Sequence, residues 1–178
     1  MKLSIGIDIG AAGAWATHYE GRWEYGKLPK VSDDFDLPTL FNQLHRGLGN
    51  EPDVTYHCVI EDLHSVYGSS AASNFTFGYN NGLIVGFLQS LRIPFVKVGA
   101  KRWQKELWEG VRPVQKLDGK KLNKDGTPKY KVDTKATSLI AAKRLFPDLT
   151  FLATERSRVP DNNLVDAVLL AEYCRRHF

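Results

Sequence analysis

An apolar run at the start of the chain, residues 3–9, contains a single carboxylate, Asp8. Runs rich in isoleucine and valine are typical of buried central strands, and a buried carboxylate costs free energy unless it is paired or binds a metal ion. A second such run ends at Glu61, and Asp166 lies within a late helical pattern. The chain must fold so that these three carboxylates are accommodated. A divalent-metal site is the arrangement that they indicate.

The order of the expected elements describes an α/β fold with a mixed, five-stranded sheet. The elements are, in chain order, strands at 3–9, 14–19 and 22–28 forming an antiparallel meander, a helix at 37–48, a strand at 55–61, a helix at 71–91, a strand at 93–98, and helices at 99–108, 133–146 and 163–177. Right-handed crossovers would set the strand of Asp8 beside the strand of Glu61, so that both carboxylates share one end of the sheet.

Length and composition favour one intracellular domain over residues 1–178. A chain of this size buries about 70 % of its unfolded surface. Its apolar runs fall short of the roughly 20 residues that cross a bilayer, and a strand follows directly after Met1-Lys2, unlike a signal peptide. Cys58 and Cys174 lack metal-ligand spacing, so we expect reduced packing residues, a cytoplasmic location and no membrane partner.

Basic residues are concentrated in one part of the chain. Residues 97–135 contain 12 Lys and Arg against 5 Asp and Glu, although the whole chain has a net charge of only +4. A basic block beside an acidic site suits an enzyme that acts on a polyanion, whereas a solvated lysine-rich loop is the alternative explanation. Within this block, residues 110–132 carry turn signals and no helical pattern, which predicts a basic loop or hairpin.

Three glycines, Gly78, Gly82 and Gly86, recur on one face of the helix expected at 71–91. Each glycine costs a helix up to about 1 kcal/mol relative to alanine. Their register therefore predicts that another backbone approaches this face closely. Either the sheet or a second subunit is the expected neighbour.

A set of motifs is distributed along nearly the whole chain: Gly6-Ile-Asp8-Ile-Gly10, Ile60-Glu61-Asp62-Leu63, the glycine-bearing helix, Trp103-Gln-Lys105 and Asp166-Ala-Val-Leu-Leu-Ala. Together they resemble the RuvC-type Holliday junction resolvases, and the phage and prophage branch in particular. The resemblance implies a ribonuclease H-like fold, a homodimer, and two Mg²⁺ ions per site that Mn²⁺ can replace. It implies that Asp8, Glu61 and Asp166 are catalytic metal ligands.

A fourth ligand position is less regular. The bacterial pattern has an aspartate three residues before the last one, where this chain has Asn163, whereas Asp161 matches a variant associated with the phage branch. We expect Asp161 to be the fourth catalytic ligand. The alternatives are that Asp161 only caps the last helix, or that Asn162 or Asn163 supplies a neutral oxygen.

Residues expected to bind DNA fall into three groups. His64 and Tyr67 follow the Glu61 strand, where the family places residues at the junction crossover, although a plain loop is equally compatible. Lys101, Arg102 and Lys105 lie at the start of a short helix, a natural position for phosphate contacts. The third group comprises the lysines of the basic loop: Lys116, Lys120, Lys121, Lys124, Lys129 and Lys131.

The expected function is that of a structure-selective DNA endonuclease that resolves Holliday junctions and other branched DNA symmetrically. In two-metal hydrolysis, carboxylates hold two divalent ions about 3.5–4 Å apart, one activating water and one stabilising the leaving oxygen. The alternatives are a nuclease for RNA–DNA hybrids and a junction-binding protein with a degenerate site. An actin-like or sugar-kinase ATPase is built from two subdomains of about this size, and 178 residues supply only one. We therefore expect no nucleotide cofactor.

Overall fold

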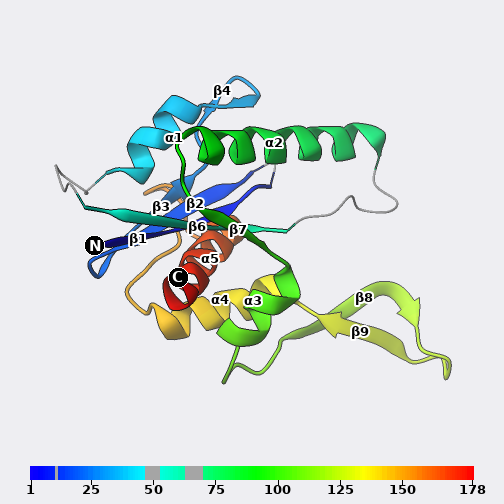
Figure 1. Ribbon diagram of the computed structural model, residues 1–178. Coiled ribbons are helices and arrows are strands. Elements are labelled where there is room, and N and C mark those ends of the chain that lie inside the picture. Colours follow the sequence, from blue (N-terminus) through cyan, green and yellow to red (C-terminus); the bar gives the residue numbers. More distant parts are fainter. Residues whose placement is uncertain (11, 47–52, 63–69) are drawn as a thin grey trace.

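The computed structural model describes residues 1–10, 12–46, 53–62 and 70–178. Its centre is a five-stranded sheet with the strand order β3-β2-β1-β6-β7 (Figure 1). The strands are β1 (Lys2–Asp8), β2 (Ala14–Tyr19), β3 (Arg22–Lys27), β6 (Thr55–Glu61) and β7 (Phe95–Val98). The first three pair antiparallel, whereas β6 runs parallel to β1 and β7 runs parallel to β6. The predicted mixed sheet with its meander is confirmed.

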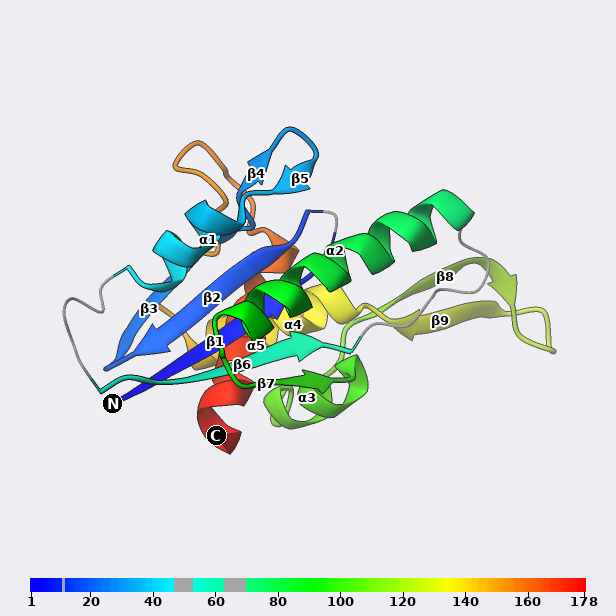
Figure 2. The same ribbon diagram turned by 45° about the horizontal axis from the view of Figure 1, so that its top comes forward.

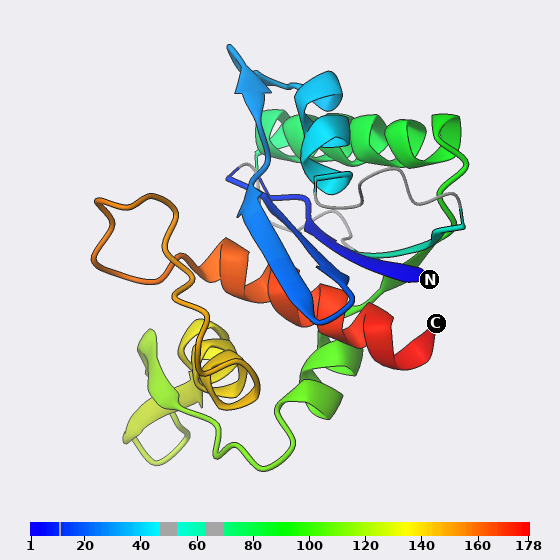
Figure 3. The same ribbon diagram turned by 90° about the vertical axis from the view of Figure 1, so that its left-hand side faces the viewer.

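In the described part of the chain, five helices cover the two faces of this sheet (Figures 1 and 3). They are α1 (Leu37–Leu44), α2 (Ala71–Ser90), α3 (Ala100–Leu107), α4 (Thr134–Leu145) and α5 (Asn162–His177). One face carries α1 and α2, and the other carries α5 with α3 and α4 beside it. Aspartate or serine side chains at Asp36, Ser70, Asp133 and Asp161 accept hydrogen bonds from first-turn amides, so all the helices but α3 start at a side-chain cap.

The two faces of strand β1 present different surfaces to the helices that cover them. Leu3, Ile5 and Ile7 pack into the core under α1 and α2, because alternate side chains of a strand point to the same face. On the opposite face, a β-carbon added to Gly6 would lie 2.2 Å from the backbone nitrogen of Ala171 and 2.3 Å from the backbone oxygen of Ala167. The missing side chain therefore lets α5 lie directly against β1.

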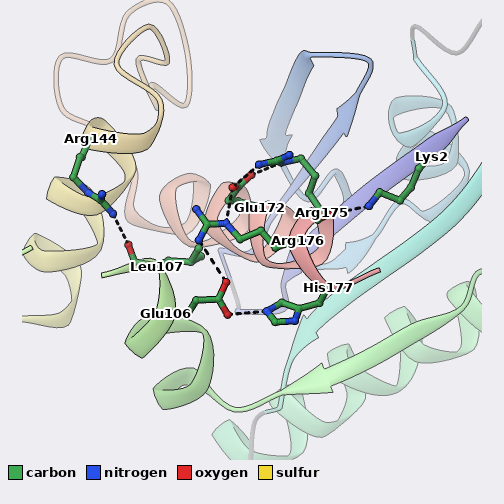
Figure 4. Close-up of polar contacts among 8 residues, drawn as sticks. All are labelled: Lys2, Glu106, Leu107, Arg144, Glu172, Arg175, Arg176 and His177. Atoms are coloured by element: carbon green, nitrogen blue, oxygen red, sulfur yellow. Dashed lines mark hydrogen bonds and ion pairs between the residues drawn. The ribbon is translucent and has the colours of Figure 1, made fainter. Parts of the chain in front are cut away.

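Charged residues hold the C-terminal end of α5 to its neighbours (Figure 4). Glu172 is buried and accepts hydrogen bonds from Arg175 at 2.7 Å and Arg176 at 2.8 Å. Burial raises the pKa of Glu172, but these hydrogen bonds outweigh it, so the pKa lies below its ordinary value. His177 Nε2 lies 2.7 Å from Glu106 Oε2, which ties α5 to α3.

Two short hairpins lie outside the main sheet. Strands β4 (Lys30–Val31) and β5 (Asp34–Phe35) form one within a segment that the sequence predicts as loop. Strands β8 (Gln115–Leu122) and β9 (Pro128–Val132) form the other, at the position of the predicted basic loop or hairpin. This second hairpin extends away from the sheet and helices (Figure 2).

The sequence predicts that either the sheet or a second subunit lies against the glycine-bearing face of α2. Apart from the helix's own backbone, no atom of the described residues lies within 4 Å of a β-carbon built on Gly78, Gly82 or Gly86. The alternative that the sheet covers this face is therefore wrong, because α2 packs on the sheet through Ile84, Leu88 and their neighbours instead.

Among the described helices, none is long and apolar enough to cross a membrane.

Candidate active site

Two of the predicted carboxylates end neighbouring strands. Asp8 is the last residue of β1 and Glu61 the last residue of β6. The parallel register of these strands runs to the pair Ile7–Ile60, so both carboxylates leave the sheet at the same edge. The sequence predicts this placement, and the topology confirms that the two strands are adjacent.

Helix α5 brings the third carboxylate over the same edge. Because Gly6 admits the backbone of α5 at Ala167, the preceding residue Asp166 is carried above the end of β1. Asp8 follows Gly6 by two residues and therefore faces the α5 side of the sheet. The close contact between β1 and α5 thus joins Asp8 and Asp166.

Burial and neighbouring carboxylates disfavour the ionisation of all three carboxyl groups. Burial, followed by the charges of Asp8 and Glu61, raises the pKa of Asp166 to about 7. Burial also raises the pKa of Asp8, against a hydrogen bond from the amide of Gly10 at 3.3 Å. For Glu61, burial and the charge of Asp8 raise the pKa, and the indole of Trp103 opposes the shift. Negative charge is therefore concentrated and incompletely compensated at this edge.

The chemistry of these donors fits a hard divalent cation. Asp166 Oδ1 is buried and has no hydrogen-bond partner among the described residues, although buried carboxylate oxygens normally have one. A Mg²⁺ ion would satisfy that oxygen and offset the mutual repulsion. Within the part of the chain that the structure describes, however, no three His, Cys, Asp or Glu side chains are gathered closely enough to hold a metal ion as they stand. Binding would thus require the carboxylates to turn toward one another.

Asp161 caps α5 and also forms an ion pair. Its Oδ1 accepts hydrogen bonds from the amides of Asn163 at 2.9 Å and Leu164 at 3.2 Å. Lys27 Nζ lies 3.1 Å from both carboxylate oxygens. Burial raises the pKa of Asp161, but the hydrogen bonds from Lys27 and the amides outweigh it, so the pKa lies below its ordinary value. The helix cap that was named as the alternative is present, and among the described residues no amide donates a hydrogen bond to Oδ2.

Asn163 connects the start of α5 to the first turn of the sheet. Its side-chain amide nitrogen donates a hydrogen bond of 2.8 Å to the carbonyl oxygen of Ala12. Ala12 lies in the turn between β1 and β2, so this bond fastens the start of α5 to the turn that follows Asp8.

Three further residues act on the site. Lys27 shares one row of the sheet with Asp8, because Asp8 pairs with Ala14 and Ala14 pairs with Lys27. The sequence did not lead us to expect a role for Lys27. The pairing register of the three-stranded meander is the feature that could have placed it beside Asp8. Trp103 is buried and donates a hydrogen bond of 3.3 Å to Glu61. Lys135, in the first turn of α4, lowers the pKa of Asp8 and Asp166 by its charge.

The residues predicted to bind DNA are placed on two elements. Lys101, Arg102 and Lys105 are exposed on α3, the helix whose buried Trp103 donates a hydrogen bond to Glu61. The basic-loop lysines lie on the β8–β9 hairpin: Lys116, Lys120 and Lys121 on β8, Lys124 at the turn, and Lys129 and Lys131 on β9. His64 and Tyr67 lie outside the described residues.

The sheet order, the helices on both faces and the carboxylates at the strand ends define a ribonuclease H-like fold. Comparison with solved structures makes this more specific. RuvC of Thermus thermophilus in complex with a Holliday junction substrate is similar, with a TM-score of 0.54 and 10 % sequence identity over 99 % of this chain and 97 % of that chain. A second Thermus thermophilus RuvC structure has a TM-score of 0.50 and 12 % identity, covering 95 % of this chain and 90 % of that one.

The fold is therefore a RuvC-like ribonuclease H fold, as the sequence predicts. No protein-family model and no curated protein matches the sequence. At 10–12 % identity, the likeness establishes the architecture and leaves the activity to be argued from the site.

Proposed function

We propose that this protein is a divalent-metal-dependent endonuclease that resolves Holliday junctions and other branched DNA. The single observation that carries this proposal is the group of Asp8, Glu61 and Asp166 at one edge of a RuvC-like sheet, where burial and neighbouring carboxylates raise the pKa of each. Carboxylates in this state are poised for divalent cations, and the basic α3 and β8–β9 surfaces suit a polyanion.

Bound at this site, Mg²⁺ or Mn²⁺ would supply activation of water and stabilisation of the leaving oxygen in phosphodiester hydrolysis. Asp8, Glu61 and Asp166 would hold the ions, and Asp161 Oδ2 is the proposed fourth ligand. Trp103 orients Glu61 through its indole N–H, and Lys135 adds positive charge where a phosphate would enter.

We further propose that the protein acts as a homodimer, because symmetric nicks on two opposed strands need two active sites. An apolar groove of about 800 Å³ lies between α1 and α2. Its lining includes Phe41, Leu83, Gly82 and Gly86, and the two glycines have open space where a side chain would be. Of the two predicted neighbours of the glycine face, we therefore propose the second subunit, which would cover Gly82 and Gly86.

The assignment to the phage and prophage branch is also a proposal, supported by Asp161 standing five residues before Asp166. A cytoplasmic setting is supported by Cys58 and Cys174, which are free and buried, as expected for a reducing compartment. A single domain over residues 1–178 and the absence of a nucleotide cofactor belong to the same proposal.

The test is cleavage of an end-labelled four-way junction in Mg²⁺ or Mn²⁺, with an RNA–DNA hybrid and a linear duplex alongside. Asp8→Asn removes a proposed ligand, and Asp33→Asn, at an exposed turn, is the matched control. We expect paired symmetric nicks for the unchanged protein and for Asp33→Asn, and a rate at least about 100-fold lower for Asp8→Asn. Preferential cutting of the hybrid would support the ribonuclease alternative. Junction binding without cutting in either metal would support a degenerate site.

A further inference from the structure

The β8–β9 hairpin has one apolar face and one basic face. Leu117 and Tyr130 form a cross-strand pair, with 53 % and 59 % of their surface exposed. The next pair, Lys116 and Lys131, points to the opposite face, since successive side chains of a strand alternate. An isolated two-stranded hairpin is marginally stable in water, so one that exposes a leucine and a tyrosine side by side calls for a partner.

The hairpin is anchored beside the proposed active site. The amide of Asp133 donates a hydrogen bond of 2.7 Å to Val114, and the amide of Val114 donates one of 3.0 Å to the Thr137 hydroxyl. These bonds join both ends of the hairpin to the first turn of α4. Lys135, in that turn, acts electrostatically on Asp8 and Asp166. A nucleic acid held at the carboxylates would therefore pass the base of the hairpin.

Charge decides what the apolar face can contact. Residues 115–132 contain six lysines and two aspartates. Asp118 pairs with Lys121 at 3.2 Å and with Lys131, so the hairpin holds part of its own basic charge in place. The hairpin of a second copy would bring like charges together, whereas a polyanion would be attracted. Among polyanions, one that offers unstacked aromatic bases would also cover Leu117 and Tyr130.

We propose that the β8–β9 hairpin is a wedge that inserts Leu117 and Tyr130 against unstacked bases at a DNA branch point. Its lysines hold the flanking phosphates. This inference rests on the proposed function, because it takes branched DNA as the ligand. It adds the feature by which a branch would be told from continuous duplex, where stacked bases offer no such surface.

The test measures binding without Mg²⁺ or Mn²⁺, so that no strand is cut. The probes are a four-way junction with 2-aminopurine next to the branch point and a continuous duplex of the same length. The variants are Leu117→Ser/Tyr130→Ser and Tyr130→Phe, which keeps the ring. Val31→Ser is the matched control, since this side chain is 64 % exposed on β4, which lies apart from the β8–β9 hairpin (Figure 2).

We expect the unchanged protein, Tyr130→Phe and the control to raise 2-aminopurine fluorescence on the junction. The double serine variant should lose this rise and bind the junction at least about fivefold more weakly, because it lacks the aromatic ring on which a base would stack. Its affinity for the duplex should stay within about twofold. An equal loss on both DNAs, or no loss on either, overturns the wedge. The wedge is also overturned if sedimentation shows that the double serine variant has a different oligomeric state and if this difference accounts for the lost affinity. That result would favour a protein partner for the apolar face of the hairpin.

The two proposals fail separately. If the unchanged protein raises the fluorescence but cuts no strand in Mg²⁺ or Mn²⁺, the nuclease proposal fails and the wedge stands. If the double serine variant cuts junctions as well as the unchanged protein does and the fluorescence never rises, the wedge fails and the nuclease proposal stands.

Discussion

At the residue scale, the carboxyl group of Asp166 shows how strongly position determines chemistry. Burial and the charges of Asp8 and Glu61 raise its pKa to about 7, whereas Asp161 in the turn before it has a lowered pKa because Lys27 and two amides bind it. Two aspartates five residues apart are thereby given opposite electrostatic environments. One is short of positive charge, and the other is already paired.

This difference gives a pH prediction for the metal-free protein. Because the pKa of Asp166 is raised in the folded state, the unfolded chain releases this proton first as pH rises. The free energy of unfolding therefore falls between about pH 4 and pH 7 and is constant above that range. Asp166→Asn removes that loss. We expect the variant to be more stable than the unchanged protein at pH 8 by roughly 2–4 kcal/mol and nearly equal to it at pH 4.

Urea unfolding at pH 4, 6 and 8 measures this difference, with Asp33→Asn as a control that should follow the unchanged protein at each pH. A gap between Asp166→Asn and the unchanged protein that stays constant from pH 4 to pH 8 would contradict the electrostatic account. Added Mg²⁺ should raise the stability of the unchanged protein at pH 8 more than that of Asp166→Asn, because the variant lacks a proposed ligand.

At the element scale, the contact between β1 and α5 determines whether a site forms. At Gly6, the backbone atoms of Ala167 and Ala171 occupy the volume that a side chain would need. We expect Gly6→Ala to lower the free energy of unfolding by about 3 kcal/mol, because the helix backbone must move. Gly78→Ala, with open space and a helical backbone, should instead raise it by about 0.5–1 kcal/mol.

Urea midpoints of the two alanine variants test this pair of opposite signs. If Gly6→Ala unfolds at the same urea concentration as the unchanged protein, α5 does not depend on a side-chain-free strand, and the account of how Asp166 reaches Asp8 is wrong.

At the scale of the whole molecule, the groove between α1 and α2 is the surface that the proposed dimer would cover. Gly82 lines this groove and Gly78 does not, although both have open space around them. We expect Gly82→Gln to convert the proposed dimer to monomer without loss of folding, and Gly78→Gln to leave it a dimer. Sedimentation equilibrium measures the change. Equal behaviour of the two variants would contradict dimerisation through this groove.

Most of the fold was predictable from local pattern. The run of residues 3–9, the turns after it and the apolar repeats of the later helices indicated the elements, and the helix expected at 71–91 is observed at Ala71–Ser90. Caps and turn residues act within a few positions of the chain, so a sequence displays them directly. Asp8, Glu61 and Asp166 were likewise identifiable, because a carboxylate inside or beside an apolar run is conspicuous.

What the sequence determined by itself was therefore the order of the elements, the carboxylates at their ends and the basic character of residues 110–132. Only the tertiary structure decided that Lys27 meets Asp161, that Trp103 binds Glu61, and that the glycine face of α2 is left open. The physical reason is distance along the chain: Lys27 and Asp161 are 134 positions apart, and their contact depends on sheet register and helix docking together. Such contacts follow from packing, which no local pattern encodes.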